Sequence, residues 1–119
     1  MEIIYNRLYW ANPDDIVASE LFIAGDGDYS SNSALDLARC LVEKYDECSQ
    51  GFIADLVTGG IVNPLWCYSR QEITILDGHH RLAVAYVHNL EVPLFIDTSV
   101  NGSKYYSQLR KESRLLSTQ

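Results

Sequence analysis

The chain has 119 residues, 47% of them hydrophobic, and a formal net charge of −7. This length can bury one apolar core, so a structural metal or disulfide bonds are not needed for folding, and we expect one compact domain over residues 1–119. The acidic balance disfavours nucleic acid as a partner, because the average surface field repels phosphate backbones, whereas a basic protein partner remains compatible with it.

Three cysteines, Cys40, Cys48 and Cys67, occur without a C-x-x-C pair. This odd number and spacing argue against a disulfide framework and a structural zinc site, and they favour a reducing, cytoplasmic setting. The N-terminal stretch "MEIIYNRLYWANPDD" has no long apolar run. We therefore expect neither a signal peptide nor a membrane association.

The first half of the chain predicts two strands and then two helices. Residues 2–8 are β-prone, and "ANPDD" predicts a turn because Pro13 restricts the preceding residue to extended geometry. "SELFIAG" predicts a second strand, and the polar "GDGDYSSNS" predicts a loop. Apolar residues at i, i+3, i+4 and i+7 predict a helix from Ser33 onward. A second helix over 52–57 is expected to end at the glycine pair 59–60.

The second half predicts a hairpin, a helix, a strand and a final helix. Residues 65–68 and 73–76 are short apolar runs on either side of the polar "SRQE", as in a hairpin. "DGHH" follows, and the pattern then predicts a helix over 81–89 and a strand in "EVPLFID". The tail predicts a C-terminal helix over 103–117.

The residues that can carry chemistry gather in "ILDGHHRLAVAY", where Asp77, Gly78, His79, His80 and Arg81 join an apolar run to a predicted helix. A glycine lets backbone amides approach a ligand, and the first turn of a helix offers N–H donors and a positive dipole end, which suits phosphate. Arg81 would add a planar charged fork, and either histidine could donate a hydrogen bond or move a proton. Residues 78–81 are thus the phosphate-binding candidates, and Asp77, His79 and His80 are the catalytic ones.

A structural interpretation of the same residues has comparable weight, because histidines at a helix start can simply cap it. The preceding strand and following helix favour anion binding, since this is the setting in which helix N-termini bind anions. Two observations would instead indicate a scaffold. One is an Arg81 side chain that points to a carboxylate partner, and the other is a turn at Gly78 that is filled by protein side chains.

The stretch "GGIVNPLWCYSRQEITILDGHHRLAVAYVHNLEVPLFI", from Gly59 to Ile96, resembles the core of the ParB/sulfiredoxin superfamily. There, a G-[I/L]-x-x-P-[I/L] segment leads into a hairpin, G-x-[H/R]-R opens a helix, and a "VP" strand follows. The resemblance implies an α+β fold with a small mixed sheet and helices packed around it. It also implies that the G-x-x-R turn holds nucleotide phosphates, as in CTP-binding ParB proteins and ATP-using sulfiredoxins.

The departures from the patterns of these families argue against two activities. Sulfiredoxins carry a catalytic cysteine where this chain has His79, so sulfiredoxin activity is not expected. Partitioning ParB proteins carry G-E-R-R where this chain has residues 78–81, and they continue into DNA-binding and dimerisation regions for which this chain has no room. Centromere-type DNA clamping is therefore not expected either.

The "DGHHR" spelling, which includes Asp77, is most similar to free-serine kinases. In these proteins the turn is implied to bind the nucleotide while a carboxylate elsewhere acts as base. Glu20, Asp26 and Asp28 are the alternatives for that base, and the sequence does not decide among them.

Other residues have weaker functional interpretations. Asp26 and Asp28 alternate as calcium-loop ligands do, but the expected glycine and glutamate positions hold other residues, so only a magnesium role stays open. Trp10 and Trp66 could stack a base, yet large aromatic side chains more often fill cores or interfaces. His88 lies near a predicted helix end, where a cation complements the dipole.

Three functions follow from these features. The first is a nucleotide- or phosphate-binding domain, using ATP, ADP or CTP with Mg²⁺, that hydrolyses or transfers a phosphoryl group as an NTPase or small-molecule kinase. The second is a non-catalytic acidic module that binds or regulates a protein partner. The third, a nuclease, is the least favoured because of the charge.

Overall fold

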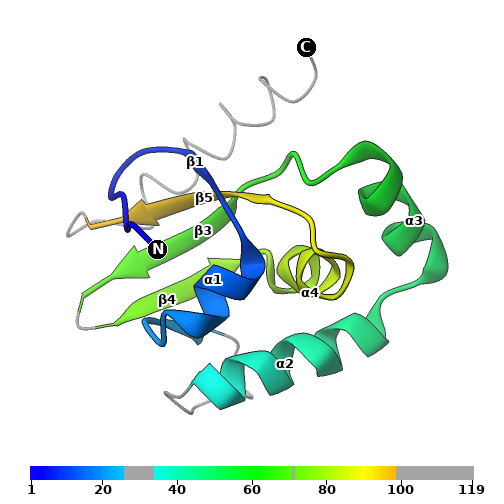
Figure 1. The fold of residues 1–119 in the computed structure, drawn as a ribbon, viewed down its shortest axis with the longest axis horizontal. Coiled ribbons are helices and arrows are strands. Elements are labelled where there is room, and N and C mark those ends of the chain that lie inside the picture. The colour runs from blue at the N-terminus through cyan, green and yellow to red at the C-terminus, as the bar shows by residue number, and fades with distance from the viewer. Residues whose placement is uncertain (26–33, 71, 99–119) are drawn as a thin grey trace.

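The computed structural model describes residues 1–25, 34–70 and 72–98. These residues form a five-stranded sheet and four helices (Figure 1). In chain order the elements are β1 (Tyr9–Ala11), α1 (Pro13–Ala18), β2 (Phe22–Ala24), α2 (Ala34–Glu47), α3 (Gln50–Gly59), β3 (Leu65–Ser69), β4 (Ile73–Asp77), α4 (His79–His88) and β5 (Val92–Asp97).

The sheet is mixed, with the strand order β1-β5-β3-β4-β2. β5 pairs antiparallel with β1 and parallel with β3, β3 pairs antiparallel with β4, and β4 pairs parallel with β2. Every residue of β5 is buried, which matches its continuous apolar sequence, since a strand covered on both faces does not alternate. The expected α+β architecture, with a small mixed sheet and helices packed around it, is confirmed.

α4 is the central helix of the molecule, and α1, α2 and α3 all contact it (Figure 1). Its four consecutive residues Leu82 to Ala85 are completely buried, so one helical turn is apolar all round. Two of these residues are alanines, which allow neighbouring elements to approach closely. The strand β4 leads into this buried helix through the single residue Gly78.

The N-terminal predictions were partly wrong. Residues 2–8 form no strand, and β1 comes after them at Tyr9–Ala11. The "ANPDD" segment begins the helix α1, where Asn12 is the N-cap and its side chain accepts a hydrogen bond from the Asp14 amide. The reason is that this segment carries the signals of a helix start, namely an Asn cap, Pro13 at the first position and acidic residues in the first turn.

The other predicted elements are confirmed with shifted ends. α3 ends at Gly59, and its C-cap is Gly60, whose φ is +79° and whose amide donates to the Leu56 carbonyl over 2.8 Å. The hairpin of β3 and β4 is present, and α4 begins at His79, two residues before the expected start. The predicted loop after Gly25 and the C-terminal helix over 103–117 lie outside the described residues.

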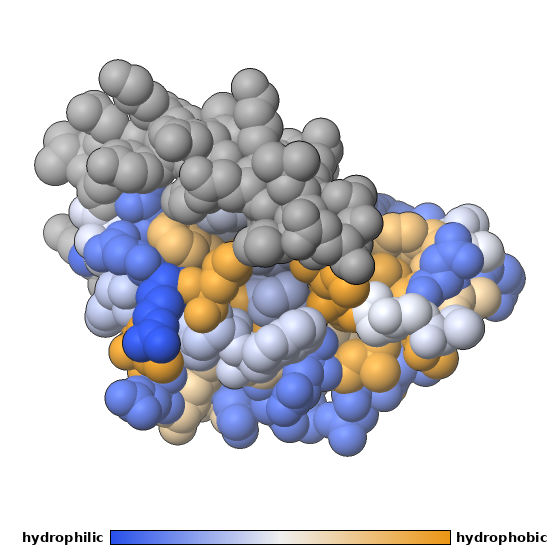
Figure 2. Space-filling view, turned by 90° about the horizontal axis from the view of Figure 1, so that it is seen from above, coloured by the Kyte–Doolittle hydropathy of each residue, from blue (hydrophilic) through white to orange (hydrophobic). Residues whose placement is uncertain are grey.

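The two tryptophans differ in their surroundings. Trp66 is 3% exposed and packs on Phe95, with the ring centroids 5.1 Å apart, so its expected core position is confirmed. Trp10 is 59% exposed because it lies on the edge strand β1, so it is not a core residue, and of the expected core or interface position only the interface stays a prediction for it. Figure 2 shows further hydrophobic residues exposed between hydrophilic ones on the face seen from above.

A search of the described helices for a membrane span found none that is both long and apolar enough.

Candidate functional site

The turn between β4 and α4 depends on Gly78. This residue is the N-cap of α4, with φ at +101°, and it supplies no side-chain cap. A Cβ atom at this position would lie 2.5 Å from Leu65 Cδ2 and 2.9 Å from Arg81 Nη2. Both the left-handed backbone and the close approach therefore require glycine.

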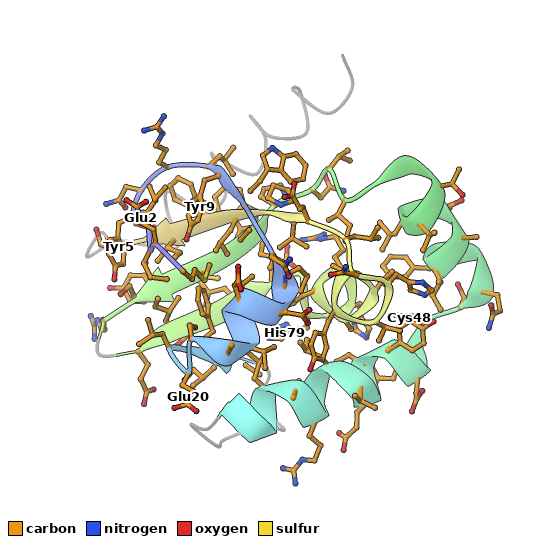
Figure 3. All side chains as sticks on the ribbon, in the orientation of Figure 1. Glu2, Tyr5, Tyr9, Glu20, Cys48 and His79 are labelled. Carbon is orange, nitrogen blue, oxygen red and sulfur yellow. The ribbon has the colours of Figure 1, made fainter. Side chains whose placement is uncertain are left out.

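A pocket of about 540 Å³ opens at the first turn of α4. One wall is the turn itself, and the other is the joint between α2 and α3, which is where Figure 3 labels Cys48. The lining residues are Glu47, Cys48, Ser49, Phe52, Asp77, Gly78, His79, His80 and Arg81. All five residues predicted from "DGHHR" thus line one pocket.

His80 links the two walls. Its Nε2 donates to the Oε2 atom of Glu47 over 2.8 Å, and the side chains of both residues are about half exposed. The same Oε2 atom lies 3.7 Å from the ammonium of Lys44, a lysine that is almost buried. Glu47 is therefore flanked by a cation and a titratable ring, an arrangement that orients its carboxylate at the pocket wall.

Arg81 makes contacts within the protein. Its Nη2 donates to the Pro64 carbonyl over 3.0 Å and lies 3.6 Å from Oδ2 of Asp77. The contact with Asp77 is the carboxylate contact that indicates a scaffold role, and the hydrogen bond to Pro64 links the turn to the segment before β3. Arg81 also lines the pocket, so its permanent charge still acts on whatever enters.

His79 holds the end of β2. Its Nε2 accepts a hydrogen bond from the Gly25 amide over 3.2 Å, and the same amide also donates to the Ile75 carbonyl over 3.0 Å. A protonated ring would face an N–H donor with another N–H, which would break this contact. Its position between β2 and the pocket gives His79 a structural role beside any role in binding.

The α2–α3 wall contains four site residues that the sequence reasoning missed: Glu47, Cys48, Ser49 and Phe52. Ser49 is the N-cap of α3, and its Oγ accepts from the Phe52 amide over 3.1 Å. The serine three positions before Phe52 is a helix-start signal, and it could have indicated a sharp corner here. The pKa of the Cys48 thiol is raised by burial and, secondly, by the Glu47 carboxylate.

Of the other carboxylate candidates, Glu20 alone lies within the described residues. Glu20 lies in the turn after α1, with φ at +59°, and it does not line the pocket. Asp26 and Asp28 lie outside the described residues. Within residues 1–25, 34–70 and 72–98, no group of three or more His, Cys, Asp or Glu side chains is arranged to hold a metal ion. Among the described residues, the carboxylates that line the pocket are Asp77 and Glu47.

No protein-family model matches the chain, and neither a curated protein nor a solved structure is significantly similar to it.

Proposed function

We propose that this chain binds a nucleotide in the pocket, with the phosphates at the 77–81 turn, and that it hydrolyses or transfers a phosphoryl group. The observation that carries the proposal is the pocket of about 540 Å³ at the N-terminal end of α4, a helix of ten residues. A helix N-terminus attracts anions through its dipole and its first amides. Arg81 adds a permanent positive charge at the same wall.

The side chains of the pocket have distinct roles in this proposal. His80 contacts the phosphate end of the ligand, and Glu47 orients the ring through their 2.8 Å hydrogen bond. A carboxylate and an imidazole in contact can accept a proton from a hydroxyl group or water near neutral pH. Mg²⁺ is commonly held by one or two carboxylates together with ligand phosphates, and it would neutralise phosphate charge beside Asp77 and Glu47.

A thermal-shift experiment with ATP, ADP and CTP in the presence of Mg²⁺ tests binding. A ligand at 100 times its Kd stabilises the folded chain by about 2.7 kcal/mol, which raises the melting temperature by several degrees. We expect H80Q to lose most of this shift. The matched control is H88Q, because His88 is an exposed histidine at the opposite end of the same helix, where it contacts Tyr45.

The absence of a shift with all three nucleotides would contradict the proposal. If binding is found, phosphate release with H80Q and E47Q separates the two roles, since a binding residue raises KM and a proton acceptor lowers kcat. A shift without phosphate release would leave binding in place and contradict catalysis.

A second candidate function is a non-catalytic acidic module that binds or regulates a protein partner in the cytoplasm. The observation that favours it is the contact of Arg81 with Asp77 and the Pro64 carbonyl, which engages the guanidinium inside the protein. The net charge of −7 suits a basic partner surface. This candidate predicts a complex with a partner and no nucleotide turnover.

A further inference from the structure

The pocket is larger than a phosphate group needs. Its volume of about 540 Å³ lies within the roughly 300–1,000 Å³ range of pockets for drug-sized ligands. A ligand that fills it must therefore carry a sizeable group besides the anion.

The two walls differ in chemistry. The turn of residues 77–81 presents one carboxylate, two histidines and one arginine. On the α2–α3 wall, the Ser49 hydroxyl accepts from the Phe52 amide, and the Cys48 thiol donates to the Lys44 carbonyl over 3.3 Å. The Glu47 carboxylate is charged, whereas the half-buried Phe52 is the largest apolar residue among the described residues that line the pocket.

We infer that Phe52 is the platform on which the base of the bound nucleotide stacks. This inference rests on the proposed function, and it assigns the ligand to the nucleoside di- or triphosphates rather than to simple phosphate esters. Stacking of a base on an aromatic ring strengthens binding by about 5- to 150-fold. Because every base has a π face, a stacking platform discriminates weakly among bases, and ADP and CDP should bind within about tenfold of each other.

Titration calorimetry with ADP and pyrophosphate separates the base from the phosphates. We expect the unaltered chain to bind ADP at least about fivefold more tightly than pyrophosphate. F52A should bind the two with equal affinity, and F52Y, which keeps the ring, should retain the preference for ADP. The matched control is V57A, since Val57 is on the same helix, is 43% exposed and does not line the pocket.

A melting curve for each variant shows whether it folds, and F52L replaces F52A if the alanine variant does not. F52L keeps apolar volume without an aromatic ring, so it should also lose the preference for ADP. An undiminished preference in either variant would overturn the platform and leave the phosphate turn standing. Equal binding of ADP and pyrophosphate by the unaltered chain would do the same. If neither ligand binds the unaltered chain, the proposed function itself fails.

Discussion

Gly78 determines the path of the chain at the pocket, and its replacement should be costly. G78A places a Cβ atom 2.5 Å from Leu65 Cδ2 on a backbone with φ at +101°. A non-glycine residue in such a conformation costs about 1–3 kcal/mol. We expect urea denaturation to show a loss of this size in the free energy of unfolding.

The matched control for this substitution is G51A. Gly51 lies in the first turn of α3, and an added Cβ there would meet no atom within 4 Å. Alanine is favoured over glycine in a helix by up to about 1 kcal/mol, so G51A should be neutral or stabilising. Equal losses in the two variants would show that the β4–α4 turn does not need glycine.

Cys48 lines the pocket and is the one cysteine of the three that is not buried, so its rate of alkylation reports on the pocket. Its pKa is raised by burial and by Glu47, so its thiolate fraction at a given pH is lower than that of an ordinary thiol. We expect alkylation by iodoacetamide to be slow at neutral pH and to rise at a higher pH than for a small free thiol. Mass spectrometry of the labelled chain gives this profile.

Two comparisons show whether the pH dependence of Cys48 alkylation depends on the surroundings of Cys48 in the pocket. E47Q removes one of the two causes, so its profile should move part of the way toward that of a small thiol. A ligand in the pocket should slow the labelling at every pH. A rate profile that matches a free thiol, or that E47Q leaves unchanged, would contradict the described surroundings of Cys48.

At the scale of elements, the sequence predicts what local patterns determine. The hairpin of β3 and β4 and the helix α4 follow from short-range apolar periodicity and turn residues, and they appear within two residues of the predicted ends. The strand β1 was placed wrongly because its three residues are selected by pairing with β5, and Trp10 lies opposite Pro93, 83 positions later. Such pairing leaves no local signal.

The same limit explains why the sequence predicted the residues of the β4–α4 turn but not those of the α2–α3 wall. The residues of the "DGHHR" turn are consecutive, so their joint position was readable from the sequence. Glu47 and His80 are 33 positions apart, and their contact depends on how α2 packs along α4. Each helix was predicted separately, but no pattern within either helix indicates the angle or register at which the two meet.

At the scale of the whole molecule, the two tryptophans separate the edge of the sheet from its core. Trp10 is 59% exposed, whereas Trp66 is 3% exposed. Acrylamide should therefore quench two distinct populations of fluorescence in the folded chain, and W10F should leave only the protected one. In urea both tryptophans become accessible. A single population in the folded chain would contradict the position of β1 at the sheet edge.

Quenching of Trp10 also distinguishes the two candidate functions. Trp10 is not among the residues that line the pocket, so a nucleotide bound there should leave its quenching unchanged. A protein partner that covers the exposed apolar residues near β1 would protect Trp10 and leave Trp66 as it was. Protection of Trp10 by a partner, together with no thermal shift from nucleotides, would favour the acidic binding module. In that case the sheet edge at β1 would bind a protein, and the pocket at the N-terminal end of α4 would bind no nucleotide.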